Sequence, residues 1–374
     1  MLTIKSNLII KTIFKYVKKR IILNMTRYNK ALQNKLNVKK NDFEHYKLFK
    51  LINQQYNFDF KDIDNKVLDL SNKKIGNKIF EYLNEVNFTS LSEIDLSLNL
   101  ITEIKAIEND NFISIQNLNL CYNKIENISE IEKFNLKNLK VLSLGINRIS
   151  DIKVLEKVNF TELKILSLYG NKINDINPLE NANFPKLEKL NLNQNNISNI
   201  DVLGKIKFIN LKELYLSGNE ISDIEILKNA QFPKLQFLDL IKNKISNIKV
   251  LKEVNFKELK NLSLTGNEIS DIKVLSKVYF PKLEILNLGK NKISDISVLE
   301  NVDFKELKEL ILSNNGISDI EVFNFTRFDK LETLNLNETK IKESKCTEII
   351  ELLKSKIHNF YYSYKPKEKK RFLD

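Results

Sequence analysis

Residues 211–221 read Leu211-Lys212-Glu213-Leu214-Tyr215-Leu216-Ser217-Gly218-Asn219-Glu220-Ile221, and this stretch decides the fold. It follows the pattern L-x-x-L-x-L-x-x-N-x-I, which recurs at constant spacing along most of the chain. The first position of the repeat is filled, without insertion or deletion, by Leu91, Ile115, Leu139, Leu163, Leu187, Leu211, Leu235, Leu259, Leu283, Leu307 and Leu331. Such fixed spacing is typical of a solenoid, because each repeat has to stack on the next at the same height.

The first half of each repeat predicts a short strand followed by a turn. The apolar residues of L-x-L alternate with period two, so they should share one side of the strand, and successive strands should pair in parallel about 4.8 Å apart. The ninth position is Asn in ten successive repeats, from Asn99 to Asn315. Because an Asn amide carries both donors and acceptors, we expect this row to bond backbone groups where the chain turns.

The second half of each repeat predicts a return along the outer face. Its pattern is I-S-D-I-x-x-L-x-x-V-x-F, as in residues 269–280, and Ser or Asp ahead of the apolar residues indicates a capped short helical or 3₁₀ turn. One position carries Phe88, Phe112, Phe160, Phe184, Phe208, Phe232, Phe256, Phe280, Phe304 and Phe328, with Leu136 as the one replacement. We expect these rings to stack in the core, each contributing about 1.5–3 kcal/mol by burial.

The repeated pattern resembles the leucine-rich repeat family. The Ser-Asp-Ile-x-x-Leu part resembles the internalin type and the related regulatory subunit of protein phosphatase 1, and residues 175–179 are the closest single match. Those families mostly use repeats two residues shorter, so only the architecture is carried over. The resemblance implies an α/β solenoid, a horseshoe or arc with a parallel concave β-sheet, short helical or 3₁₀ convex segments and helical caps.

The chain divides into five parts by pattern and charge. We expect a basic leader over 1–41, an N-terminal cap over 42–66, the solenoid over 67–343, a C-terminal capping helix over 344–363 and a basic tail over 364–374. The solenoid comprises a divergent first repeat and then eleven 24-residue repeats starting at 91. The formal charge of +12 belongs to the ends, since the leader has eleven Lys and Arg residues and no acid, and the tail carries a net charge of +3.

The leader predicts a basic amphipathic helix over residues 1–23. Lysines occupy a different sector of that helix from the apolar stripe of Ile10, Ile13, Phe14, Val17 and Ile21. Such a helix is typical of contact with anionic lipid or of an organelle presequence. Three alternatives stay open: disorder, nucleic-acid contact, or a true translation start at Met25, which would remove the segment. We expect a cytoplasmic protein, with an organellar or membrane-peripheral location as the alternative.

Nothing in the chain predicts catalysis, a cofactor, a metal site or specific nucleic-acid binding. No phosphate loop and no dinucleotide motif is present. His45 and His358 lie in opposite flanks, and Cys121 and Cys346 belong to no Cys/His cluster. The recurring acids Asp151, Asp223, Asp271, Asp295 and Asp319 are interpreted as turn caps. We therefore predict that the protein is not an enzyme.

The concave sheet is the surface that remains for function. Its outward positions, the third, fifth and seventh of each repeat, are mostly small or polar. They are interrupted by Val141, Ile165, Tyr169, Tyr215, Phe237 and Ile241, with Ile285 and Ile311 further on. Aromatic and aliphatic groups on such a sheet are typical of a protein interface, although a solenoid also leaves some aliphatic surface exposed. We predict a protein-binding scaffold; the alternatives are a regulatory subunit of a phosphatase or small GTPase and a peripheral membrane protein.

Overall fold

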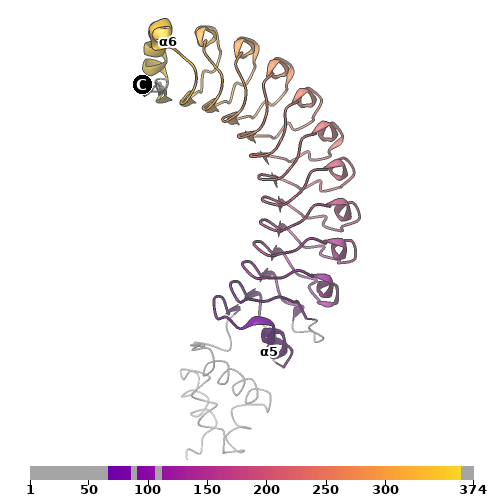
Figure 1. The fold of residues 1–374 in the computed structure, drawn as a ribbon. Helices are drawn as coiled ribbons and strands as arrows, with labels where there is room; N and C mark the ends of the chain where they lie inside the picture. The colour runs from indigo at the N-terminus through magenta and orange to yellow at the C-terminus, as the bar shows by residue number, and fades with distance from the viewer. Residues whose placement is uncertain (1–65, 86–90, 106–111, 364–374) are drawn as a thin grey trace, which may run out of the picture. The chain divides into compact units, whose positions relative to one another are not determined.

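The computed structural model describes residues 66–85, 91–105 and 112–363 (Figure 1). The chain forms two compact units, Met1–Leu139 and Lys140–Asp374, called here the N-terminal and C-terminal units. Within each unit, three-residue strands succeed one another in sequence order and pair in parallel. The predicted solenoid with a parallel sheet is therefore confirmed.

The N-terminal unit contains three described strands. They are β1 (Val67–Asp69), β2 (Glu93–Asp95) and β3 (Asn117–Asn119). After β1 the chain forms the 3₁₀ helix η1 (Gly76–Lys78) and the α-helix α5 (Ile79–Glu85), and after β3 it forms η3 (Ser129–Lys133). The α-helix was not expected, because the divergent first repeat lacks the Ser-Asp-Ile pattern from which a 3₁₀ turn was predicted.

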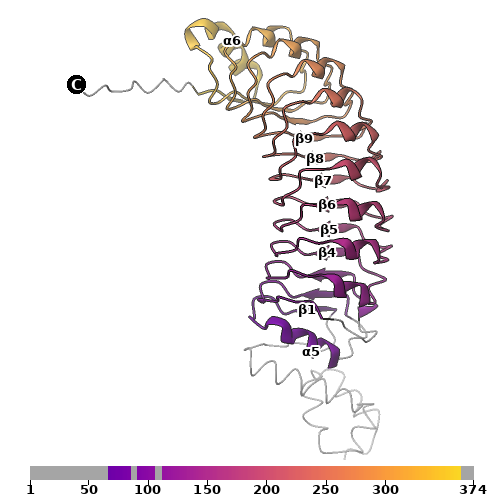
Figure 2. The ribbon, with the colours of Figure 1, turned by 45° about the vertical axis from the view of Figure 1, so that its right-hand side comes forward.

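The C-terminal unit contains ten strands, and all of them lie within the described residues. They are β4 (Val141–Ser143), β5 (Ile165–Ser167), β6 (Lys189–Asn191), β7 (Glu213–Tyr215), β8 (Phe237–Asp239), β9 (Asn261–Ser263), β10 (Ile285–Asn287), β11 (Glu309–Ile311), β12 (Thr333–Asn335) and β13 (Asn359–Tyr361). Figure 2 shows β4 to β9 side by side. From β4 to β12 each residue pairs with its equivalent in the next repeat, as Leu214 does with Leu238.

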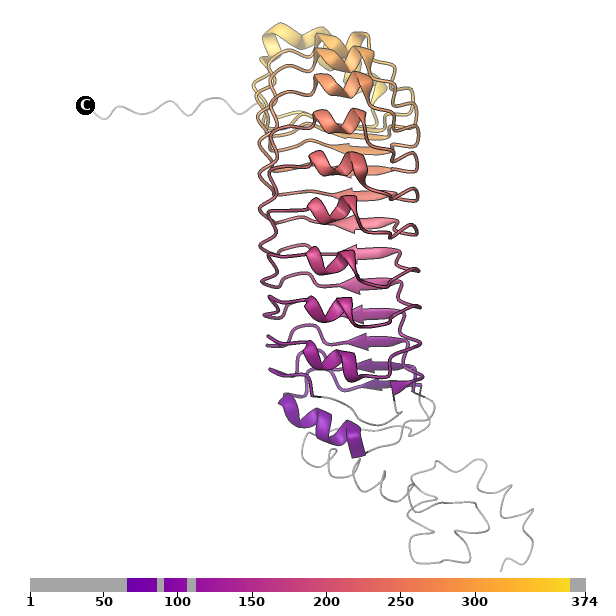
Figure 3. The same ribbon diagram turned by 90° about the vertical axis from the view of Figure 1, so that its right-hand side faces the viewer.

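Short 3₁₀ helices alternate with these strands. They are η4 (Lys153–Glu156), η5 (Asn177–Glu180), η6 (Asp201–Gly204), η7 (Glu225–Asn229), η8 (Lys249–Lys252), η9 (Lys273–Lys277), η10 (Ser297–Asn301) and η11 (Glu321–Asn324). The strands line the inner side of the curve of this unit and the helices its outer side (Figures 1 and 3). The recurring acids cap these turns: Oδ1 of Asp223 accepts the N–H of Glu225 at 2.8 Å, and the other four act in the same way.

The asparagine row bonds the backbone as predicted. Nδ2 of Asn219 donates to the carbonyl oxygens of Leu192 and Leu216, both at 3.0 Å, while its Oδ1 accepts the N–H of Ile197 at 3.0 Å. One side chain therefore joins its own turn to the turn of the preceding repeat. Since these bonds of Asn219 are buried and those of Asn291 are partly buried, the row satisfies polar groups that water reaches poorly or not at all.

Leucines, isoleucines and phenylalanines fill the space between the strands and the outer turns. Leu211, Leu214, Leu216 and Ile221 are completely buried. The phenylalanine rings stack from repeat to repeat, with ring centroids 6.2 Å apart for Phe160 and Phe184, 6.1 Å for Phe184 and Phe208, and 6.4 Å for Phe232 and Phe256. Three pairs of neighbouring rings therefore stack as expected in this unit.

The C-terminal end differs from the expected capping helix over 344–363. The helix α6 spans Glu343–Lys356, and Asn359–Tyr361 forms β13 instead of continuing the helix. Strand β13 pairs with β12 in parallel and opposes Leu334 with Phe360. Residues Asn359–Tyr361 are therefore the last strand of the sheet within the described residues, because extended backbone there bonds the edge that β12 would otherwise leave open.

Several predictions fall outside the described residues. These are the leader, the N-terminal cap apart from Lys66, the basic tail, Phe88, His45 and the lipid-contact candidates of residues 1–23. Within residues 66–85, 91–105 and 112–363, no helix is long and apolar enough to cross a membrane.

Candidate protein-binding surface

The candidate site is the strand face, defined here as the side chains at the third, fifth and seventh positions of the repeats in the C-terminal unit. All six residues predicted to bind a partner lie on it and are half-buried: Val141, Ile165, Tyr169, Tyr215, Phe237 and Ile241. The leucines between them are fully buried, as Leu142, Leu166 and Leu238 show. The alternation of the strand thus divides core from surface as its sequence indicates.

Five of the six residues form two groups. In the first, Val141 and Ile165 oppose each other on β4 and β5, and the Tyr169 ring lies so close to Gly145 that a Cβ atom there would collide with it. In the second, Tyr215 on β7 and Phe237 on β8 place their ring centroids 4.9 Å apart with an interplanar angle of 33°. Strand β6 separates β5 from β7, so these predicted residues form two patches on the strand face and not one.

A lysine and a glutamate hold the Tyr215 ring in place. The hydroxyl of Tyr215 donates to Oε2 of Glu213 at 2.8 Å, and Nζ of Lys189 forms an ion pair with the same oxygen at 2.8 Å. The Lys189 ammonium also lies 4.7 Å from the centroid of the Tyr215 ring. The ring is therefore fixed by a hydrogen bond at its tip and by a cation–π contact at its face.

The ionisation of this group follows from its surroundings. Burial and the hydrogen bond to Glu213 raise the pKa of Tyr215, so its hydroxyl stays protonated and can donate. Burial opposes the charge on Glu213, but hydrogen bonds from Lys189 and Tyr215 outweigh it and lower the pKa of that carboxyl. The pKa of Lys189 is raised, since the Glu213 carboxylate outweighs the effect of burial. Both charges of the pair are therefore present at neutral pH.

Asp239 is a member of the surface that the sequence analysis did not identify. It opposes Tyr215 in the register of β7 and β8, and it is only 7% exposed. Its Oδ1 accepts the N–H of Ile241 at 3.0 Å, and its Oδ2 accepts Nδ2 of Asn193 at 3.5 Å. Burial raises the pKa of this carboxyl above its ordinary value. A recognisable signal was present, because an acid stands where most repeats carry Ser or Asn.

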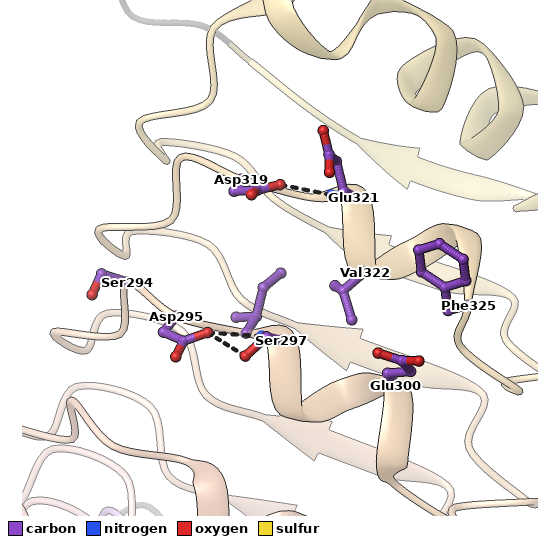
Figure 4. Close-up of a pocket in the computed structure, with 9 residues that line it drawn as sticks. Ser294, Asp295, Ser297, Glu300, Asp319, Glu321, Val322 and Phe325 are labelled. Carbon is purple, nitrogen blue, oxygen red and sulfur yellow. Dashed lines mark hydrogen bonds between the residues drawn. The ribbon is translucent and has the colours of Figure 1, made fainter.

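A second concavity lies on the outer side, between η10 and η11 (Figure 4). It encloses about 250 Å³ and includes Asp295, Glu300, Asp319, Glu321 and the exposed ring of Phe325 in its lining. Asp295 and Asp319 cap their turns, and hydrogen bonds from the side chain and backbone of Ser297 lower the pKa of Asp295. These two carboxylates are engaged in the fold and do not form an acid–base pair.

Candidate metal ligands and thiols also occur in the described part of the chain. Among its residues, no group of three or more His, Cys, Asp or Glu side chains could hold a metal ion. Neither Cys121 nor Cys346 forms a disulfide within the described residues, and the pKa of the buried Cys346 thiol is raised, chiefly by burial, which disfavours a reactive thiolate.

Comparison with known proteins identifies the type of repeat. A profile of two consecutive leucine-rich repeats matches residues 113–157, 161–205, 209–253, 257–301 and 305–349. No curated protein sequence matches the chain. Proteins built from this repeat generally act as scaffolds that bind other proteins.

Three solved structures illustrate the similarity. An internalin from Listeria monocytogenes is 25% identical with a TM-score of 0.60, over 96% of this chain and 98% of that one. A leucine-rich repeat protein from Leptospira interrogans is 20% identical with a TM-score of 0.52, over 82% of this chain and 92% of that one. A chain from an octameric complex of latrophilin 3, Unc5D and FLRT2 is 21% identical with a TM-score of 0.57, over 75% and 86% of the two chains.

These comparisons agree with the pattern read from the sequence. The internalin likeness extends over nearly the whole of both chains, which confirms the predicted resemblance to internalin-type repeats. Each profile match begins two repeats after the one before it, so each covers two of the observed strands in the same register. Because these matches span more than half of its residues, the chain belongs to the leucine-rich repeat family.

Proposed function

We propose that the protein is a scaffold that binds another protein through the strand face of its C-terminal unit. The observation that carries the proposal is the Tyr215–Phe237 pair, two aromatic rings in contact on a surface where the fold requires neither. At the register of Tyr215 other strands carry Ser167 or Asn191, which keep the same backbone pairing. Aromatic side chains that the fold does not need are typical anchors of protein interfaces.

The surroundings of the pair support the same function. The Tyr215 ring is fixed by Glu213 and Lys189, so a partner would meet a side chain whose freedom is already reduced. Such preorganisation lowers the entropic cost of association. Among the similar structures, the assembly of latrophilin 3, Unc5D and FLRT2 shows a leucine-rich repeat protein in complex with other proteins.

The identity of the partner and the membrane alternative remain predictions. A phosphatase or a small GTPase would be bound by the same kind of surface, and an assay of the captured enzyme would identify it. The membrane alternative depends on residues 1–23, which lie outside the described residues. Flotation of the full chain with anionic liposomes, compared with a chain that begins at Met25, tests that alternative.

The test of the proposal is capture of proteins from an extract of the source organism. The full chain is compared with the double variant Tyr215→Ala/Phe237→Ala and with the control Tyr279→Ala, which removes a 67% exposed ring outside the strand face. We expect the native chain and the control to retain the same protein and the double variant to lose it by about tenfold or more. Equal capture by all three, in chains with similar Tm, would contradict the proposal.

A further inference from the structure

Asp239 stands out in the row of side chains at the fifth position of the repeats. The strands of the C-terminal unit, all within the described residues, carry no other acid in this register. The row consists of Ser143, Ser167, Asn191, Tyr215, Asp239, Ser263, Asn287, Ile311, Asn335 and Tyr361. The N-terminal unit also carries acids in this register, Asp69 and Asp95, and Oδ1 of each accepts the N–H two residues ahead. Asp239 differs from both because it is buried, and a buried carboxylate needs a reason that the repeat does not supply.

The fold does not need the charge of Asp239. Its Oδ1 accepts the backbone N–H two residues ahead, from Ile241, at 3.0 Å. Neutral asparagines make the same bond elsewhere: Oδ1 of Asn191 accepts the N–H of Asn193 at 3.0 Å, and Oδ1 of Asn287 accepts the N–H of Gly289 at 3.1 Å. An amide thus performs the structural role without a charge.

The charge also opposes folding. Asp239 is 7% exposed, its second oxygen receives only the 3.5 Å bond from Asn193, and no ammonium or guanidinium group of the described residues forms an ion pair with it. Burial raises the pKa of the carboxyl, which records the poor solvation of its ionised form. By contrast, Glu213 on the neighbouring strand is paired with Lys189 at 2.8 Å. A buried charge without a counterion is a structural cost that binding can offset.

The same surface already holds one ammonium group. Lys189 lies 4.7 Å from the centroid of the Tyr215 ring and 2.8 Å from a carboxylate oxygen of Glu213. A ring face and a carboxylate together therefore bind a cation on this face. Phe237 and Asp239 offer the same two chemical groups within one strand, and Phe237 has no lysine over it among the described residues.

We infer that the strand face binds a lysine or arginine side chain of its protein partner at the Tyr215–Phe237 pair, beside Asp239. This inference rests on the proposed function and adds the chemistry of the partner. The ring faces attract a cation through their quadrupoles, and the Asp239 carboxylate supplies a negative charge that pairs with that cation. A phosphate-rich ligand is disfavoured there, since Asp239 and Glu213 would repel it.

A random dodecapeptide library displayed on phage tests the inference. The full chain is immobilised, and the peptides it selects are sequenced and then measured individually. We expect Lys or Arg next to apolar residues to be strongly enriched. A selected peptide should bind the Asp239→Asn variant about tenfold more weakly or worse, since a desolvated charge pair has lost one partner. Glu309→Gln, a charge removal elsewhere on the same face, is the matched control and should leave affinity unchanged.

The possible outcomes separate this inference from the proposed function. Peptides that need Tyr215 and Phe237 but show no basic enrichment, or that bind Asp239→Asn as tightly as the native chain, overturn the inference and leave the protein-binding surface standing. Peptides that bind the Tyr215→Ala/Phe237→Ala variant unchanged, or a library that yields no binder, overturn both. If Asp239→Asn does not fold, Asp239→Ser replaces it, because serine occupies this register at Ser167 and Ser263.

Discussion

The interior of the C-terminal unit and its strand face obey different rules, although both are built from the same repeats. Inside, a given position carries the same residue with the same contacts: Asn219 and Asn243 bond the backbone in the same way. On the strand face, one register carries Ser167, Tyr215 and Asp239 in turn. Where the residue repeats, the fold dictates it; where it varies, the fold tolerates many residues and binding can select among them.

The largest expected effect separates two phenylalanines. Phe256 is 1% exposed and stacks on Phe232 in the core, so Phe256→Ala should lower the free energy of unfolding by about 3–5 kcal/mol. Phe237→Ala removes a half-buried ring from the strand face and its contact with Tyr215, and it should cost about 1–2 kcal/mol. Urea denaturation measures both. Similar losses would show that Phe237 belongs to the core.

The second comparison uses two asparagines. Asn219→Ala leaves the buried N–H of Ile197 without its acceptor, while the carbonyls of Leu192 and Leu216 each lose one bond and keep the one from Asn195 or Asn243, so a loss of about 1–3 kcal/mol is expected. Asn261→Ala on the strand face removes a half-buried amide whose oxygen accepts the hydroxyl of Ser263, and less than about 1 kcal/mol should be lost. Urea denaturation measures both losses of stability. A loss for Asn219→Ala no greater than that for Asn261→Ala would contradict the proposed role of the asparagine row.

What the sequence predicts correctly is what the repeats share. The strands, the asparagine row and the outer 3₁₀ turns all recur at one constant spacing, so each copy supports the prediction for the others. Strand β13 was not predicted, because Asn359–Tyr361 lacks the L-x-L pattern and its pairing of Asn359 with Thr333 departs from that spacing. The helix α5 was not predicted either, because the divergent first repeat lacks the Ser-Asp-Ile pattern found in other repeats.

The site was predicted less completely than the fold. Periodicity identified Tyr215 and Phe237, because it tells which side of a strand faces outward. It could not show that Lys189 lies over the Tyr215 ring, since that depends on how two long side chains are oriented across neighbouring strands. Nor could it show that Asp239 is buried, because one of its partners, Asn193, comes from two repeats earlier.

Asp239→Asn should have a smaller effect on stability than the substitutions above, and it should stabilise the protein where they destabilise it. The pKa of this carboxyl is raised in the folded protein, so its ionised form is less favourable there than in the unfolded chain. At neutral pH Asp239→Asn should therefore raise Tm slightly, and the gain should vanish as the pH falls below the ordinary value of 3.8, where the carboxyl is protonated in both states. Thermal melts from pH 7 to pH 3 test this. A lower Tm for the variant at pH 7 would mean that the charge stabilises the fold.

The smallest expected effect lies on the rim, defined here as the row of charged side chains at the second position of the repeats, where Lys260, Glu284 and Lys308 alternate in charge. Glu284 is flanked by Lys308 at 2.8 Å and Lys260 at 3.8 Å, and the hydrogen bond from Lys308 is the main reason why the pKa of Glu284 is lowered. A lowered carboxyl pKa gives stability that is present above the ordinary value of 4.5 and is lost as the pH falls through the folded value. Glu284→Gln should therefore be slightly less stable than the native chain at pH 7 and equal to it in acid.

Salt distinguishes this rim from both regions compared above. The Glu284 pairs are open to solvent in part, so high salt should screen them and reduce the difference between Glu284→Gln and the native chain at pH 7. The losses at Phe256 and Asn219 should persist, because they arise from buried contacts. Denaturation at low and high salt therefore separates the ion pairs of the rim, which depend on salt, from the buried contacts of Phe256 and Asn219, which do not. A Glu284→Gln effect that persists in high salt would place that glutamate with the interior residues, despite its position on the surface.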